Sequence, residues 1–328
     1  MSPSTPPPDA VLPPAATGSW RRHPPGLQLW VGVGVLAVYL GIAISALVVF
    51  HGSDTLSSNP AWTPPWVILG PSWTYPFGIL NGFGVNLVTA LWQATPWDLA
   101  IIFSILALDA VLGAVIGTLA GLYEGRWPDT LVTFIGDSLG SIPAIFLVVV
   151  VFGGLAILAP KGDNLVLFVL LFGFILWPTC ARIVRERARV LAHQPYVEAA
   201  RAAGASDRRI LLRHLLPNSF QPILAQLPID LVAIYLVLSV FPWWTCTTYM
   251  PLPASYYVPT LPAFSPLPSP WFPEWGYLLG NGACLAFPVP AEPVYWWMFA
   301  FPLLAVVGLG LGLALLLDGI EEWTRVPM

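Results

Sequence analysis

Long apolar runs separated by shorter polar segments dominate this chain. Six of the runs approach or exceed the length that a helix needs to cross a bilayer, about 20 residues. They lie at about 29–50, 98–122, 131–159, 165–181, 223–245 and 295–317. None alternates apolar and polar residues as membrane barrel strands do, and backbone groups in lipid must bond internally. The pattern therefore predicts an all-α polytopic membrane protein with six transmembrane helices.

The composition agrees with this class and excludes several others. Hydrophobic residues make up 57% and charged residues 9% of the 328 residues, where a soluble protein carries about 25% charge. The net charge of −4 argues against binding to nucleic acid. Three cysteines without clustered histidines give no zinc motif, and no nucleophile and base pattern indicates an enzyme. The single lysine, Lys161, stands outside any P-loop pattern, so the chain has no ATP-binding loop of its own.

The basic residues predict the orientation. With the N-terminus in the cytoplasm, 12 of the 13 Lys and Arg residues fall on the cytoplasmic side, and Lys161 alone falls outside. We therefore expect an N-in, C-in, multi-pass protein of the plasma membrane. The resulting segments are a Pro-rich, disordered cytoplasmic tail 1–27, a retained first transmembrane helix 28–50, an extracytoplasmic loop 51–97, a core 98–320 and a cytoplasmic tail 321–328.

Two extracytoplasmic loops are expected to be irregular. Residues 51–97 are rich in Trp, Pro and Gly, and the part at about 77–93 could lie along the membrane surface. Residues 246–294 contain eleven prolines, which exclude long helices and sheet interiors. Cys246 and Cys284 lie in this second loop, where the oxidising side of the membrane permits a disulfide.

The segment 182–217 between the fourth and fifth spans holds eight of the 13 basic residues. Pro195 at a first turn and Gly204 at an end describe a short helix. Ser206 is placed to cap a second helix that runs from Asp207 to about Leu216, where Pro217 stops it. From composition alone this helix-turn-helix could be a docking element for another protein, a loop that only sets topology, or a patch that contacts lipid headgroups.

Three acids fall within predicted spans: Asp109, Asp137 and Asp230. An acid at the centre of a span costs roughly 2.5–3.5 kcal/mol, so such residues face protein or water. They indicate either a polar translocation path or hydrogen bonding between helices and placement at the interface. The residues alone leave both interpretations open.

Several motifs, taken in order, resemble one known family. The central match begins with Glu198-Ala199-Ala200-Arg201 and Gly204-Ala205-Ser206, and continues with Arg208, Arg209, Arg213-His214 and Pro217-Asn218. Further matches are Asp137 with Ser141-Ile142-Pro143, Trp177-Pro178, Trp275-Gly276, Trp296-Trp297 and Asp318-Gly319. The set is similar to the EAA motif and its surroundings in permeases of the dipeptide, oligopeptide and nickel ABC importers, in the C-type subunit. The chain lacks the family's Gly-Thr-Asp-x-x-Gly-Arg-Asp stretch before the second span, which leaves the substrate open.

The resemblance implies a type I ABC importer permease fold with a cytoplasmic coupling helix. It implies that the chain has no catalytic role and pairs with a second permease, as a heterodimer. Two separate ATPase subunits would bind ATP and Mg²⁺, and an extracytoplasmic protein would deliver substrate, most commonly peptides. The residues implied for ATPase coupling are Glu198, Ala199, Ala200, Arg201, Gly204, Ser206, Arg208, Arg209, Arg213, His214 and Pro217.

A transporter or channel that works alone is the main alternative. Such a protein would be expected to show inverted repeats, helices broken at the midplane and a relay of titratable residues. The sequence contains no evident repeat, and its intramembrane acids are isolated from one another along the chain. A membrane-embedded enzyme is a third class, for which no motif is present.

Overall fold

The computed structural model describes residues 26–49, 70–79, 86–143, 146–147, 164–249, 274–286 and 295–324. Within these residues the regular elements are helices, apart from an isolated β-bridge between Ile79 and Asn86. The helices are α1 Leu27–Val49, α2 Leu87–Leu122, α3 Trp127–Gly140, α5 Asn164–Ala192, α6 Pro195–Ala202, α7 Asp207–Ile210, the π-turn η2 Leu211–Leu215, α8 Leu216–Asn218, α9 Gln221–Tyr249, α10 Trp275–Ala286 and α11 Trp296–Thr324. The predicted all-α class is confirmed for the described residues.

Four of the described helices have the length and apolar composition to cross a membrane. They are α1, α2, residues Gln221–Val240 of α9 and residues Trp296–Trp323 of α11. They contain the first, second, fifth and sixth predicted spans. The fourth predicted span, 165–181, lies within the 29-residue helix α5. About half of the third, 131–159, lies outside the described residues, which include its beginning as part of α3.

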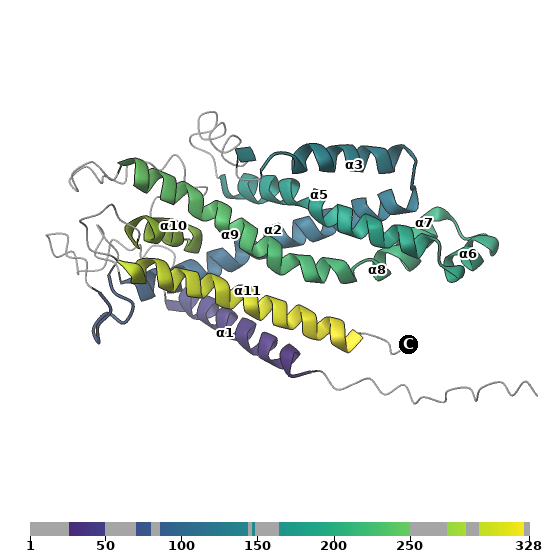
Figure 1. Cartoon of the computed structure of the whole chain (residues 1–328). Helices are drawn as coiled ribbons and strands as arrows, with labels where there is room; N and C mark the ends of the chain where they lie inside the picture. The colour runs from purple at the N-terminus through teal and green to yellow at the C-terminus, as the bar shows by residue number, and fades with distance from the viewer. Residues whose placement is uncertain are drawn as a thin grey trace, which may run out of the picture.

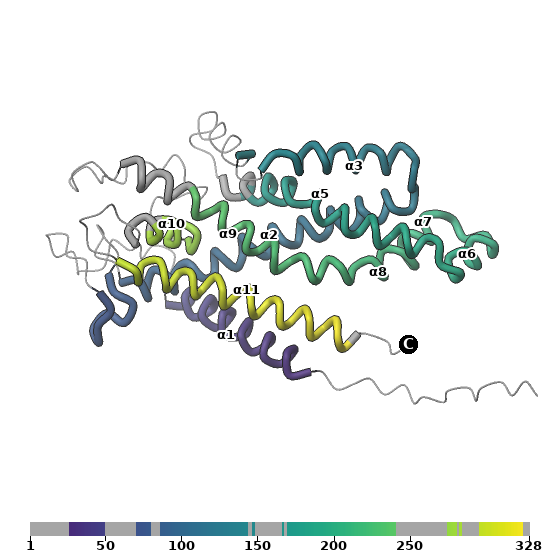
Figure 2. Tube along the Cα trace, in the orientation of Figure 1, coloured from purple at the N-terminus to yellow at the C-terminus, as the bar shows by residue number. Residues whose placement is uncertain are grey.

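The long helices lie side by side, with short helices at both ends (Figure 1). α1 and α11 are antiparallel: Gly32 approaches Leu316, and the Tyr39 hydroxyl donates a hydrogen bond to the Ala305 carbonyl at 2.7 Å. α6, α7 and α8 lie at the end of the bundle where α1 begins and α11 ends, and α10 lies at the opposite end (Figure 2). The protein thus has two distinct ends, which are built from different segments of the chain.

α2 and α5 run parallel and pack closely through three glycines on α2. A Cβ atom on Gly117 would lie 2.5 Å from the Ala181 carbonyl oxygen, and one on Gly121 would lie 2.6 Å from the Ala188 Cβ. Gly113 approaches Cys180 in the same way. Small residues spaced by four let two helical backbones approach each other in a membrane. The seam therefore fixes α5 against α2 along several turns.

The structure corrects the start of the second predicted span. α2 begins at Leu87 rather than at residue 98, so residues 87–97 are helix and not loop or surface segment. Asn86 caps this start, because its side-chain oxygen accepts a hydrogen bond from the Val88 amide at 3.0 Å. Leu87 is 1% exposed, so its burial stabilises the additional helical turns. Pro96 and the polar residues beside it obscured this extension in the apolar pattern.

The structure also corrects the expectation that loop 246–294 is irregular throughout. α9 continues to Tyr249, and the 12-residue helix α10 occupies the proline-free stretch between Pro273 and Pro288. Residues 250–273 and 287–294 lie outside the described residues. The side chains of Cys246 and Cys284 are also outside the description, so the disulfide stays a prediction.

α10 is held against the bundle by buried hydrogen bonds and close contacts. The Asp98 carboxylate of α2 accepts from the Trp275 amide at 3.1 Å and from the Tyr235 hydroxyl of α9 at 3.3 Å. The Trp275 ring donates to the Leu91 carbonyl at 3.3 Å. Gly276 lies where a Cβ atom would come within 2.5 Å of the Leu238 Cβ. One acid therefore joins three helices at this end.

Candidate functional site

The segment between α5 and α9 folds around an apolar cluster of its own. The cluster's buried members are Leu191, Ala192, Val197, Ile210 and Leu215, with Leu122 of α2 and Ala205 packed against them. Val197, Ile210 and Leu215 are all completely buried. Burial of one face of each short helix holds α6 and α7 together across the end of α5. The helix-turn-helix predicted for 182–217 is confirmed.

α6 is a short helix with one buried face. It begins with Pro195 at its first position, as predicted, and the Gln194 carbonyl accepts from the Glu198 amide at 3.2 Å. Val197 is its buried residue, whereas Glu198 and Ala199 on the other side are exposed. The outer surface of the helix therefore combines small side chains, those of Ala199 and Ala202, with the larger exposed side chains of Tyr196, Glu198 and Arg201.

Gly204 ends α6 in a left-handed conformation with φ +83°. The Gly204 amide donates to the Arg201 carbonyl at 2.9 Å, and the Ala205 amide donates to the Ala200 carbonyl at 3.0 Å. These two bonds form a Schellman motif, which satisfies carbonyls that the helix leaves free. A Cβ atom on Gly204 would meet nothing within 4 Å. Glycine is thus required here by the backbone angle rather than by space inside this chain.

Ser206 caps the second helix, as predicted, and its hydroxyl accepts from the Arg209 amide at 3.4 Å. The prediction that Pro217 stops this helix is wrong. The helical path passes through the π-turn η2 and ends at Asn218. A proline lacks the amide that would bond four residues back, and its ring crowds that carbonyl. The wider turn accommodates it, with the Leu216 amide bonded to the Leu211 carbonyl.

The eleven residues implied for coupling lie together on this end of the molecule. Exposed are Glu198, Ala199, Arg201, Gly204, Ser206, Arg208, Arg209, Arg213 and Pro217. Ala200 and His214 are partly buried, and the His214 ring lies 6.1 Å from the ring of Tyr196. Among the described residues, no carboxylate pairs with the arginines at 201, 208, 209 and 213. The described part of this surface therefore carries four arginines that form no ion pair with another described residue.

A family model described as "Binding-protein-dependent transport system inner membrane component" matches residues 113–326. The chain belongs to this family. It is 32% identical to a putative peptide transport system permease protein of Brucella suis biovar 1 over 89% of this chain and 85% of that protein.

Two further relatives of this permease carry specific names. It is 25% identical to the dipeptide transport system permease protein DppC of Alkalihalophilus pseudofirmus, over 98% of this chain and 93% of that protein. It is 37% identical to the glutathione transport system permease protein GsiD of Pectobacterium atrosepticum, over 47% of this chain and 48% of that protein. The family that its motifs resemble is thereby confirmed, and with it a multi-pass protein of the inner membrane.

The three acids of the predicted spans lie in two different environments in the permease, buried and exposed. Asp109 of α2 and Asp230 of α9 are 0% and 5% exposed, so both carboxyl groups are buried inside the helix bundle. The Gln226 side chain donates to Asp230 at 2.9 Å, whereas neither oxygen of Asp109 has a hydrogen-bond partner among the described residues. Asp137 is instead exposed on α3. Two of the acids thus lie inside the bundle, and the third faces outward.

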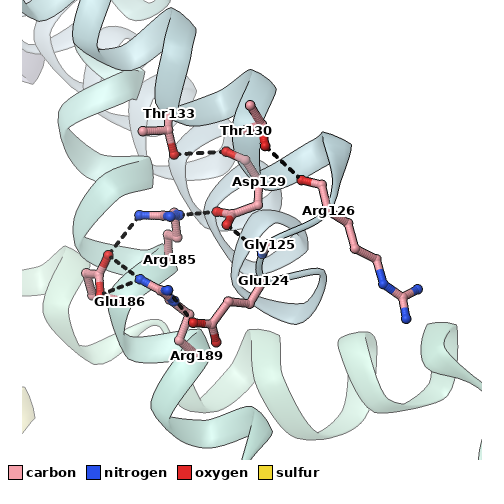
Figure 3. Close-up of polar contacts among 9 residues, drawn as sticks. All are labelled: Glu124, Gly125, Arg126, Asp129, Thr130, Thr133, Arg185, Glu186 and Arg189. Atoms are coloured by element: carbon pink, nitrogen blue, oxygen red, sulfur yellow. Dashed lines mark hydrogen bonds and ion pairs between the residues drawn. The ribbon is translucent and has the colours of Figure 1, made fainter.

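A group of charged residues that the sequence did not single out joins α5 to the turn after α2 and to the start of α3 (Figure 3). The part of α5 beyond the predicted span, residues 182–192, is called the α5 extension. Its Arg185 pairs with Asp129 at the start of α3. One turn later, Arg189 pairs with Glu124 in the turn between α2 and α3. Glu186 lies between the two arginines, 2.9 Å from Arg185 and 3.3 Å from Arg189. We call these five residues the turn network.

The turn network favours the charged state of two of its carboxylates, those of Asp129 and Glu124. The bond from Arg185 is the main cause that lowers the pKa of Asp129, and the bond from Arg189 is the main cause that lowers the pKa of Glu124. Asp129 also accepts from the Gly125 amide at 2.9 Å. The sequence contained one signal of this network, the spacing of Arg185 and Arg189 by one helical turn. It contained no sign of the acids that meet them, which come from more than fifty residues earlier.

Proposed function

We propose that this permease is the membrane subunit of an ABC importer for dipeptides and oligopeptides, and that α6 with the following short helices docks into a separate ATPase. The observation that carries the docking proposal is the exposed surface around α6. It is rigidly supported by a buried cluster, it is lined with small residues, and its arginines have no partner among the described residues. Such a surface suits a partner that brings its own acidic or helix-terminal groups.

In this proposal Glu198, Ala199, Ala200 and Gly204 form the central contact. The alanines let a partner approach closely, and Gly204 turns the chain without adding a side chain. Arg201, Arg208, Arg209 and Arg213 would supply the charged rim, and Ser206, His214 and Pro217 would keep the second helix in place. The exposure of most of this set supports the proposal.

We further propose that α6 lies on the cytoplasmic side, with both chain termini. The start of α1 and the end of α11 lie next to each other, since a Cβ atom on Gly26 would come within 3.0 Å of the Glu322 carboxylate. Both lie toward the end that carries α6 (Figure 1). This arrangement supports an N-in, C-in topology with six spans, in which positive charge gathers inside.

We propose the remaining subunits from the family to which the chain belongs. We expect a second, different permease chain beside this one, and two ATPase subunits that bind ATP and Mg²⁺. An extracytoplasmic binding protein would deliver the peptide at the end that carries α10, and lipid would surround the spans. The chain itself would open and close the path without catalysing a reaction. The names of the three relatives, which concern peptides, dipeptides and glutathione, support a peptide as cargo.

The geometry favours Asp137 over Asp109 and Asp230 as a residue of the translocation path. An acid in a span avoids lipid, so exposed Asp137 requires water or another subunit beside it. Asp137 could meet the positive amino terminus of a peptide. We expect Asp137→Asn to weaken uptake of peptides with a free amino terminus more than uptake of N-acetylated ones. Asp109→Asn is the matched control, and an unchanged cargo preference in that variant would exclude Asp109 from the path.

Reconstitution tests the function as a whole. The permease, expressed with its neighbouring transport genes, should copurify with two ATPase chains and a second permease. In proteoliposomes with the binding protein outside and ATP inside, labelled dipeptides should accumulate, and an ATPase variant that binds but does not hydrolyse ATP should abolish this uptake. Uptake without any ATPase subunit would overturn the proposal and favour a transporter that works alone.

A further inference from the structure

The turn between α2 and α3 meets the α5 extension and the α6–α8 segment in one place. This turn, residues 123–126, follows α2 directly, and Asp129 lies in the first turn of α3 (Figure 3). Leu122, immediately before it, packs against the apolar cluster under α6. The Tyr123 hydroxyl donates to the Asp207 carboxylate, at the start of α7, at 3.3 Å. We call α6, α7, η2 and α8 together the docking segment. The turn is therefore in contact with α7 of this segment as well as with α5.

Two ion pairs fix this turn to one face of α5. Arg185 and Arg189 stand four residues apart, so both side chains leave α5 on the same side. The Asp129–Arg185 pair is the more enclosed, with side chains 8% and 15% exposed, and the Glu124–Arg189 pair is more open, at 39% and 31%. Removing one partner of an enclosed pair leaves the other without compensation, whereas an open pair is replaced by water. Asp129–Arg185 is thus the stronger connection.

Asp129 also makes a second interaction in the same place. One of its oxygens pairs with Arg185, and the other accepts from the amide of Gly125, which has φ +71°. The same carboxylate therefore shapes the turn and binds α5. A shift of the α5 extension would pull directly on the first turn of α3.

α3 needs such a connection more than α2 does. α2 is already packed to α5 through Gly113, Gly117 and Gly121. α3 has a single buried residue among its 14, and this residue is Asp129. The exposed acid Asp137 lies two turns further along α3. The attachment of this helix to its neighbours therefore depends strongly on the turn network.

We propose that the turn network transmits movement of the docking segment to α3, with Asp129 and Arg185 as its positioning residues. This inference rests on the proposed function and adds to it residues outside the recognised motif. When an ATPase moves α6, the α5 extension moves with it, since both share the apolar cluster. The network carries the first turn of α3 along, and α3 carries Asp137. Without the ion pairs, α6 would still dock, but α3 would follow its movement poorly.

The test compares single substitutions with a control in the complete importer. Asp129→Asn and Arg185→Gln should each lower peptide uptake per ATP hydrolysed about tenfold, within the range for residues that carry coupling between sites. The ATPase subunits should still copurify in normal amount. Arg126→Gln removes a positive charge, as Arg185→Gln does, but from the turn itself, where Arg126 points away from the network and its guanidinium carbon lies 5.7 Å from the centre of the Tyr123 ring. This control should couple normally.

A reversed pair separates a specific contact from a general loss of structure. Glu124→Arg brings two arginines together and should lower the coupling, and adding Arg189→Glu should recover part of that loss. The remainder reflects repulsion from Glu186, which contacts Arg189 in the wild type. Arg185→Lys, which keeps the charge, should couple better than Arg185→Gln. If a single variant does not fold, the reversed pair and Arg185→Lys still give a result.

The outcomes distinguish the inference from the function on which it rests. Normal uptake per ATP in Asp129→Asn and Arg185→Gln, in an importer that works, would overturn the role of the turn network alone. An equal loss in Arg126→Gln would also overturn it, since charge in the turn would then matter without the pairs. A wild-type permease that binds no ATPase would instead overturn the proposed function.

Discussion

The two ends of the helical bundle are built on different physical principles. At the α10 end, one buried acid, Asp98, accepts hydrogen bonds from Trp275 and Tyr235. Glycines such as Gly282 of α10 let the helix backbones there approach closely. At the α6 end, the helices are short, with a Schellman motif at Gly204 and a cap at Ser206, and they pack on a small apolar cluster, while one enclosed and one open ion pair join the α2–α3 turn to α5. The α10 end thus gains its stability from burial, whereas the α6 end leaves most of its polar groups in contact with solvent.

This difference has a consequence for function. Buried hydrogen bonds and close packing resist movement, because any displacement leaves polar groups unpaired or opens a cavity. Surface ion pairs change partners at low cost, because water compensates them. The α6 end is therefore suited to bind and release a partner repeatedly. The α10 end is suited to keep α2, α9 and α10 together during such a cycle.

The largest effect is expected from Trp275→Ala, at the buried end. Trp275 is 1% exposed and its ring donates to the Leu91 carbonyl, so its removal leaves a cavity and an unpaired acceptor. We expect a loss of about 3–5 kcal/mol, as for other buried aromatic residues. Thermal unfolding of the purified permease in detergent measures this. Trp73→Ala is the control, because Trp73 is fully exposed, and an equally small effect in both variants would contradict the comparison.

The second effect is at the α6 end and should be mainly functional. Gly204→Val forces a branched side chain into a left-handed angle, which costs roughly 1–2 kcal/mol. We expect normal membrane insertion but no peptide-stimulated ATP hydrolysis by the purified importer. Asparagine adopts this angle more readily, so Gly204→Asn tests whether the turn alone matters. Normal stimulation in the valine variant would disprove the need for this turn, and loss in both would indicate that the partner requires the bare backbone.

The third prediction concerns pH at the buried end. Glu274, which precedes α10, is 4% exposed, and burial raises its pKa to about 8 from 4.5. Between these values the folded state keeps a proton that the unfolded chain releases, so stability falls as the pH rises through this window. Glu274→Gln should therefore raise the melting temperature near pH 8 and change it little near pH 4.5. The same change at both values would show that Glu274 does not titrate in this way.

The smallest effect should come from Glu186→Gln in the turn network. Glu186 is 57% exposed and lies between two arginines that have other partners. We expect the melting temperature and the coupling of the importer to stay within experimental error, since exposed ion pairs contribute little. A loss as large as that of Asp129→Asn would show that the network acts as one unit rather than through its most enclosed pair.

Turns, caps and helix ends depend on neighbouring residues and could therefore be predicted from the sequence. Pro195, Gly204 and Ser206 each act within a few residues of their own position, through a fixed φ, a left-handed turn and a cap. The helix-turn-helix was therefore predicted almost residue by residue. The prediction that Pro217 ends the second helix was wrong for a local reason as well. The helix accommodates the proline through a π-turn, which is a rare structure in proteins. Which of its residues contact an ATPase stays a prediction.

The apolar runs also determined the class of the protein, because lipid leaves a chain few alternatives to helices. The sequence by itself thus specified an all-helical membrane protein, its family motifs and the form of its docking segment. Tertiary structure alone decided the early start of α2, the position of α10 against the bundle, the burial of Asp109 and Asp230 and the pairs of the turn network. Each of these depends on residues far apart in the chain, whose approach is set by packing and by burial of polar groups. No local pattern encodes that approach.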